Sequence, residues 1–207
     1  MAWLKKPTWR LGIVYTLLGI LIYTARRPSL PSLALGLPPI LAGEALRIWA
    51  CGHLVKNKRL TTTGPYAYVK NPLYVGTILI TTGFCVLAQP LLIPIVFIGF
   101  YAYYMPRKRK IEGDRLRRIY GEAYERFERA VPDLLPQLTP YRSGDTTKFD
   151  GRLVLENSEH GTVMSVTLGI ILIFLSVWLR DEGTLPTPWW APTDYLPLIP
   201  RRSHPGL

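Results

Sequence analysis

Residues 64–76 place two X-Pro units and three tyrosines in one short segment. The segment reads Gly64-Pro65-Tyr66-Ala67-Tyr68-Val69-Lys70-Asn71-Pro72-Leu73-Tyr74-Val75-Gly76. A residue before proline is restricted to extended or turn backbone, so Gly64 and Asn71 are expected to hold this loop in a defined shape. Tyrosine hydroxyls and rings can face a ligand, and the ring faces attract a cation. The tyrosines can equally be interfacial anchors of a membrane protein, and both interpretations stay open.

Two charged residues, Glu44 and Arg47, stand inside an otherwise apolar stretch. Arg47 follows Glu44 by three residues, so the two share a helical face. Because an unpaired charge in a bilayer is costly, the spacing predicts an ion pair, either structural or bordering an active site. His53, at the end of the same stretch, is expected to be hydrogen-bonded and to bind no metal. Two cysteines without a C-x-x-C spacing signal neither a disulfide framework nor a zinc site.

The elements that must position these residues are apolar helices. The chain has 207 residues, of which 48% are hydrophobic, and this composition excludes a disordered or collagen-like protein. Crossing a hydrocarbon layer of roughly 30 Å takes about 20 helical residues. We therefore predict one all-α integral membrane domain, residues 1–207, with about five transmembrane helices. The predicted spans are 9–25, 33–54, 73–89, 90–105 and 162–179, and only Gln89-Pro90 separates the third from the fourth, which predicts a tight helical hairpin.

The distribution of basic residues predicts the orientation. Nineteen Lys and Arg residues fall on the side that would hold the amino end, the 55–72 loop and the 107–152 segment, and five fall on the opposite side. By the positive-inside rule the amino terminus is cytoplasmic and the Pro-rich tail 183–207 is external, as expected of a bacterial inner-membrane protein. A basic face beside anionic membrane lipids also accounts for the net charge of +11 without a nucleic-acid partner.

A cytoplasmic amphipathic helical stretch is predicted over residues 107–131. Its apolar side chains recur every three or four residues, and two i,i+4 ion pairs, Glu122 with Arg126 and Glu125 with Arg129, support its polar face. Gly121 is expected to bend the stretch into two shorter helices, and Pro132 ends it.

These motifs, taken in order, resemble the isoprenylcysteine carboxyl methyltransferase family, within the wider phospholipid methyltransferase-like group. The family pattern is Gly-Pro-Tyr, then Arg-His-Pro-x-Tyr, a helical hairpin, Glu-Glu-x-x-Leu, an aromatic-Gly, Tyr and a Val-Pro stop. The matching residues, within roughly 40–140, are Gly64-Pro65-Tyr66, Asn71-Pro72-Leu73-Tyr74, Glu112, Leu116, Tyr120-Gly121, Tyr124 and Val131-Pro132.

Three positions depart from the family pattern. Lys70 replaces its Arg, Asn71 replaces its His and Gly113 replaces its second Glu. Asn71 can still donate and accept hydrogen bonds but cannot act as a proton carrier. Glu112 is left as the acidic residue that would hold an ammonium or ribose group.

The resemblance implies a membrane methyltransferase that uses S-adenosylmethionine and takes a lipophilic small-molecule or lipid-modified acceptor from the bilayer. The segments 55–72 and 106–140 would build the cofactor site, with Gly64, Pro65, Tyr66, Tyr68, Asn71, Pro72, Tyr74 and Glu112 as cofactor-binding residues. Arg109, on the helical face of Glu112, would act as the catalytic residue that orients an acceptor carboxylate, with Lys108 as the alternative. A stop-transfer cluster that faces phospholipid remains a second explanation of this basic run. Attack on a sulfonium needs alignment and desolvation more than a base, so the expected acceptor is a carboxylate or thiolate.

Two other functions remain compatible with the sequence. One is a membrane NADPH-dependent reductase of the sterol-reductase kind, whose members share the carboxyl-terminal motif. The other is a non-enzymatic small scaffold or transporter that uses Glu44 and Arg47 as an intramembrane site. Such reductases are usually longer, and this sequence shows no added hydride-acceptor channel. A scaffold or transporter would have little need for the ordered loop from Gly64 to Tyr74. The sequence does not fix an oligomeric state.

Overall fold

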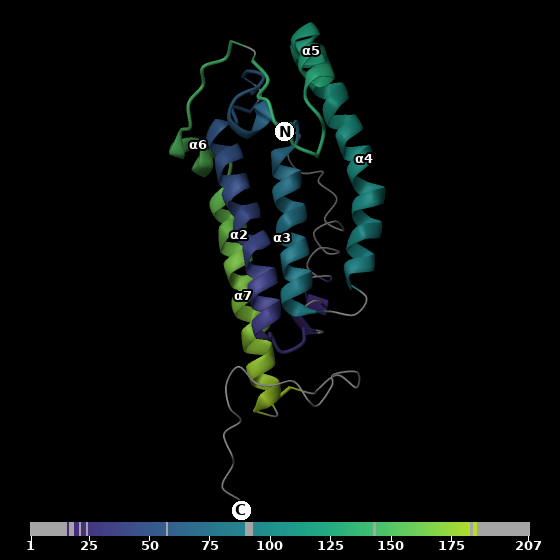
Figure 1. The fold of residues 1–207 in the computed structure, drawn as a ribbon, viewed down its shortest axis with the longest axis vertical. Helices are drawn as coiled ribbons and strands as arrows, with labels where there is room; N and C mark the ends of the chain where they lie inside the picture. The colour runs from purple at the N-terminus through teal and green to yellow at the C-terminus, as the bar shows by residue number, and fades with distance from the viewer. Residues whose placement is uncertain are drawn as a thin grey trace, which may run out of the picture.

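The computed structural model describes residues 16, 19, 20, 22, 23, 25–56, 58–89, 93–142, 144–182, 184 and 185, and every regular element among them is helical (Figure 1). This confirms the predicted all-α class. The elements, labelled as in Figure 1, are α2 (Leu30–His53), the short 3-10 helix η1 (Gly64–Ala67), α3 (Pro72–Ala88), α4 (Ile93–Tyr120), α5 (Glu122–Ala130), α6 (Gly151–Glu156) and α7 (Glu159–Asp181).

The prediction of about five membrane spans is corrected. Among the described residues, two helices are long and apolar enough to cross a membrane, α2 with 24 residues and α7 with 23. Helix α3 is apolar but has only 17 residues. Helix α4 has 28 residues because the predicted fourth span and the basic cytoplasmic stretch form one continuous helix through Pro106. The predicted first span, 9–25, lies mostly outside the described residues, and the tail, 183–207, lies almost wholly outside them.

Helices α2, α3 and α7 run side by side, and α4 stands on the other side of α3 (Figure 1). Helices α2 and α3 are antiparallel and approach closely at glycines. A Cβ atom on Gly43 would lie 2.6 Å from the Gly76 carbonyl oxygen, and one on Gly83 would lie 2.6 Å from the Gly36 carbonyl oxygen. Small residues that allow close backbone contact are typical of helix pairs in membranes.

The predicted hairpin of α3 and α4 is antiparallel but less tightly packed than α2 and α3. Gln89 ends α3 in the left-handed conformation with φ 49°. The hydroxyls of Thr81 and Tyr101 lie 3.0 Å apart and link the two helices. The glycines therefore make α2 and α3 a closely packed pair.

The predicted Glu44–Arg47 ion pair is wrong. Arg47 pairs with Glu159 of α7, with Nε 2.6 Å from Oε1 and Nη2 2.9 Å from Oε2. Helix α7 begins three residues before the predicted span, which brings Glu159 level with Arg47. Glu44 is buried, and within the described part of the chain neither carboxylate oxygen has a hydrogen-bond partner. His53 is hydrogen-bonded as expected, through Nδ1 to the Thr63 hydroxyl at 3.1 Å.

At the end of the bundle where α2 ends and α3 begins, the chain folds back on itself. Gly121, with φ 54°, separates α4 from α5 and confirms the predicted bend. The segment 132–141 then returns along residues 64–71, which we call the tyrosine loop. The Lys70 amide donates to the Pro132 carbonyl at 2.9 Å, and the Tyr141 amide donates to the Ala67 carbonyl at 2.8 Å. The loop and the segment that follows α5 are thereby held together.

Candidate functional site

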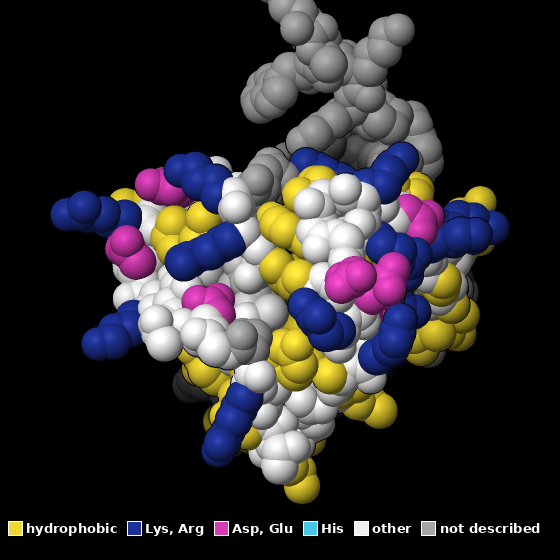
Figure 2. Space-filling view, turned by 90° about the horizontal axis from the view of Figure 1, so that it is seen from above, with side chains coloured by type: hydrophobic (Ala, Val, Ile, Leu, Met, Phe, Trp, Pro, Cys, Tyr) yellow, Lys and Arg dark blue, Asp and Glu magenta, His cyan; other side chains and the backbone are white. Residues whose placement is uncertain are grey.

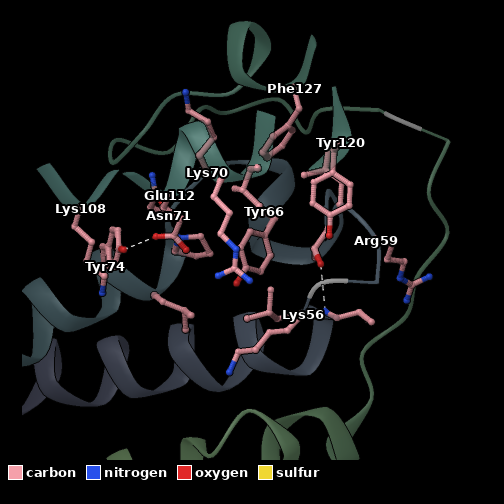
Figure 3. Close-up of a pocket in the computed structure, with 18 residues that line it drawn as sticks. Lys56, Arg59, Tyr66, Lys70, Asn71, Tyr74, Lys108, Glu112, Tyr120 and Phe127 are labelled. Atoms are coloured by element: carbon pink, nitrogen blue, oxygen red, sulfur yellow. Dashed lines mark hydrogen bonds between the residues drawn. The ribbon is translucent and has the colours of Figure 1, made fainter. Parts of the chain in front are cut away.

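A cavity of about 350 Å³ lies where the tyrosine loop meets the carboxyl-terminal half of α4 (Figure 3). We call it the first cavity. Its volume falls within the range of small-molecule sites. The predicted site residues that line it are Tyr66, Asn71, Pro72, Tyr74 and Glu112. The structure thus brings five of the nine predicted residues together, from η1, the start of α3 and the middle of α4.

Tyr74 and Glu112 are joined by a short hydrogen bond across the first cavity (Figure 3). The Tyr74 hydroxyl donates to Glu112 Oε2 at 2.6 Å. The Lys108 ammonium lies 4.9 Å from the centroid of the Tyr74 ring, within cation–π distance. One tyrosine therefore fixes the orientation of a carboxylate and carries a cation on its face.

Tyr66 forms part of the wall of the first cavity. It belongs to η1 and only 8% of its surface is exposed. Burial raises the pKa of the Tyr66 phenol well above its ordinary range, so the group stays a neutral hydroxyl at any physiological pH.

Three predicted site residues lie elsewhere. Gly64 adopts φ +59°, and the His53 ring occupies the place of a Cβ atom there, so glycine is required for the backbone and its packing. Pro65 is fully buried. Tyr68 lines, with Gly64 and Trp49, a separate cavity of about 460 Å³ on another side of the loop. The structure does not bring these three residues to the first cavity.

Arg109, the predicted acceptor-orienting residue, lines an adjoining cavity of about 270 Å³. This second cavity shares a wall with the first, made by Lys70, Asn71, Glu112, Leu116 and Phe127. Arg109 Nη1 lies 3.2 Å from Asp133 Oδ2, and Lys70 Nζ lies 2.8 Å from Asp133 Oδ1. Arg109 Nε is buried, and no described residue accepts a hydrogen bond from it.

Sequence reasoning missed the residues that close the first cavity from the far side. These are Leu60 and Leu116, together with Tyr120 and Phe127, which are labelled in Figure 3. The 3.6-residue period had marked Leu116, Tyr120 and Phe127 as the apolar face of an amphipathic helix, without showing what that face covers. They reach the cavity because the chain reverses at Gly121 and packs Phe127 against Leu60 and Tyr141.

Cations outnumber carboxylates around the first cavity. Glu112 is its one acidic lining residue among those described, and its basic lining residues are Lys56, Arg59, Lys70, Lys108 and Arg115. Figure 2, which views this end of the molecule, shows Lys and Arg side chains spread across it between apolar patches. The site is therefore suited to a ligand with a negative group and apolar surface.

Residues 45–123 match the family described as phospholipid methyltransferase. The matched residues include the tyrosine loop, α3 and all of α4. The match thus covers a central segment of the chain. The resemblance inferred from the motifs is confirmed, and the first cavity lies largely within the matched segment.

Two curated proteins are similar over part of their length. The chain is 27% identical over 146 residues to the cobalt-zinc-cadmium resistance protein CzcN of Cupriavidus metallidurans, which covers 67% of this chain and 66% of that protein. It is 25% identical over 116 residues to the nickel-cobalt-cadmium resistance protein NccN of Alcaligenes xylosoxydans xylosoxydans, covering 55% of this chain and 54% of that protein. The chain thus spans just under two thirds of one relative and about half of the other. No solved structure matches the chain.

Proposed function

We propose that this chain is an integral membrane methyltransferase that transfers a methyl group from S-adenosylmethionine to the carboxylate or thiolate of a lipophilic acceptor. The observation that carries the proposal is the first cavity, which is built by the loop and helix of the matched family segment. The family match supports the reaction class. The cofactor and the acceptor class rest on the chemistry of the residues around the cavity.

The residues around the cavity fit this cofactor. Tyr66, Tyr120 and Phe127 offer aromatic surface for a nucleobase, and the Glu112 carboxylate offers an acceptor for ribose hydroxyls or a partner for a positive group. When bound, S-adenosylmethionine would supply an electrophilic methyl group whose leaving group is a neutral thioether.

The side chains of this chain would align and desolvate the reactants. Tyr74 holds Glu112 in place through its 2.6 Å hydrogen bond. Leu116 and Phe127 add apolar surface to the lining of the site. No histidine lines the first cavity among the described residues, so the acceptor is expected to arrive already deprotonated. The surrounding lysines and arginines would hold its negative charge.

The position of the cavity suits an acceptor that stays in the bilayer. The cavity lies at the ends of the apolar helices α2 and α3, with Leu54 and Leu73 among its lining residues. A lipophilic acceptor could present its reactive group there while its hydrocarbon part remains beside the helices. We place this end of the molecule in the cytoplasm, with membrane lipids around α2 and α7, in a bacterial inner membrane.

Ligand binding to the detergent-purified chain tests the proposal against the other two classes. We expect S-adenosylmethionine to bind, with NADPH failing to compete. Binding of NADPH alone would favour a reductase, and binding of neither would favour a scaffold or transporter. Incubation with methyl-labelled cofactor and a membrane-lipid extract would then identify the methylated product.

The names of the two relatives add a physiological setting. We propose that the methylated product contributes to growth in the presence of cobalt, zinc or cadmium, as the names of those proteins describe for them. A strain lacking this chain should then be more sensitive to these metals, and a Glu112→Gln variant should not restore resistance. If the Glu112→Gln variant restored full resistance, resistance would not depend on methyl transfer by this chain.

A further inference from the structure

The second cavity holds a balanced set of charges, unlike the first. Three basic residues, Lys70, Arg109 and Lys110, and three acidic residues, Glu112, Glu128 and Asp133, line it. A cavity with both charges in equal number favours a ligand that carries both. A zwitterion is a ligand of this kind.

One donor in this cavity lacks a partner. The Arg109 guanidinium bonds Asp133 through Nη1, but its Nε is buried and no described residue accepts from it. A buried donor without a partner costs stability. A carboxylate bound beside Arg109 would accept from Nε by a charge-assisted hydrogen bond.

Gly113 lines the second cavity from the same helix as Arg109. A Cβ atom there would lie 3.3 Å from the Tyr124 hydroxyl and 3.8 Å from Glu128 Oε1. The other Glu128 oxygen is held by Arg117 Nη2 at 2.6 Å. Burial raises the pKa of Tyr124 to about 12, so its hydroxyl stays neutral and can accept from a donor. Space, a hydroxyl and a carboxylate oxygen together suit an ammonium group.

We infer that the second cavity binds an α-amino-acid zwitterion, with the carboxylate at Arg109 and the ammonium at Glu128 above Gly113. The ligand that fits the adjoining first cavity is S-adenosylmethionine, so the zwitterion is its amino-acid end, and this assignment rests on the proposed function. Arg109 is then a cofactor-binding residue and does not orient the acceptor. The shared wall of Asn71 and Glu112 would lie beside the reacting sulfur.

The test compares two ligands that differ by the amino-acid end. S-adenosylhomocysteine carries it, whereas 5′-methylthioadenosine has the nucleoside and a thioether without it. Calorimetry on the detergent-purified full chain should show that Arg109→Ala lowers the affinity for S-adenosylhomocysteine about tenfold or more, the usual effect of losing a charged hydrogen bond. The affinity for 5′-methylthioadenosine should stay within about twofold. Arg118→Ala is the matched control, because Arg118 is exposed on the same helix and lies outside the residues lining either cavity.

A second variant keeps Arg109 and its contact with Asp133. Gly113→Leu would fill the place beside Tyr124 and should weaken S-adenosylhomocysteine selectively. Equal losses for both ligands in Arg109→Ala and Gly113→Leu, or no loss for either, would overturn the inference. Unchanged nucleoside binding with a raised KM for phosphatidylserine vesicles would also overturn it, because the zwitterion would then be an aminolipid headgroup. If the wild-type chain binds neither nucleoside, the proposed function fails and the inference with it.

Discussion

Arg47 of α2 and Glu159 of α7, two residues 112 positions apart in the chain, form an ion pair through two hydrogen bonds. Arg47 also donates through Nη1 to the Thr77 hydroxyl of α3 at 2.7 Å and to the Leu73 carbonyl at 3.3 Å. One guanidinium therefore ties three helices together directly beside the first cavity, which Leu73 lines. The contact joins α2 to the first turns of α3, the part of the helix that carries Tyr74.

Breaking this ion pair should destabilise the protein strongly. Glu159→Ala leaves the Arg47 charge buried without its partner, and loss of one member of a buried pair costs about 3 to 5 kcal/mol. Thermal unfolding in detergent measures the effect. The exposed pair of Glu125 and Arg129 is the matched control, and Glu125→Ala should cost less than about 1 kcal/mol. A loss in Glu159→Ala no larger than in the control would show that the Arg47 charge does not need Glu159 as its partner.

The Tyr74–Glu112 hydrogen bond should contribute to cofactor affinity. Glu112→Gln removes the carboxylate charge at the first cavity. It should weaken the binding free energy of S-adenosylmethionine by about 1 to 3 kcal/mol. Tyr74→Phe keeps the ring but releases the carboxylate, so it should weaken binding by less. The double variant should lose less than the sum of the two, because the residues act together. Calorimetry that finds unchanged affinity in both single variants would remove Glu112 and Tyr74 from the site.

The mistaken partner of Arg47 shows that helical spacing in the sequence does not predict ion pairs between helices. Glu44 lies on the helical face of Arg47, and local spacing gave no reason to look further. The true partner depends on how α7 packs against α2, and hydropathy could not show that α7 begins at Glu159. Ion pairs within one helix, such as Glu125 with Arg129, were predictable because residues four apart share a helical face. Ion pairs between helices were not predictable in this way.

Only part of the lining of the first cavity could be predicted from the sequence. The loop residues Asn71 and Tyr74 and the helix residue Glu112 appear together in the family pattern, so their meeting was expected. The lining residues Tyr120 and Phe127 depend on the chain reversal at Gly121, where φ is 54°. The sequence indicated a bend at Gly121, but its direction follows from packing of Phe127 against Leu60 and Tyr141.

Gly64 should be required for folding more than for ligand binding. Its φ of +59° and the His53 ring against its α-carbon leave no room for a side chain. Gly64→Ala should therefore destabilise the protein by more than about 1 kcal/mol. Gly161→Ala is the control, because it is helical with open space around it and should be neutral or slightly stabilising. A Gly64→Ala variant with normal thermal stability and lost cofactor affinity would restore the direct binding role expected from the family pattern.

The two ends of the helices should lie on opposite sides of the membrane. The basic loop 55–72 and the segment after α4 share one end of the bundle, and α7 leads away from it (Figure 1). Reporter fusions at residues 145 and 205 are therefore expected on the cytoplasmic and external sides, respectively. Finding both reporters on one side would contradict a membrane-crossing α7.

The acceptor should be a group that is already deprotonated at neutral pH. A carboxylate is ionised well below pH 7, whereas a protonated amine must lose a proton before it can attack. No histidine lines the first cavity among the described residues, and Asn71 stands where the family pattern has one. The five basic lining residues would attract a carboxylate and repel an ammonium headgroup. In a product assay with labelled cofactor and a lipid extract, we therefore expect the label as a base-labile methyl ester or on sulfur. Base-stable label on the nitrogen of an aminolipid would show that the five basic lining residues do not select the acceptor.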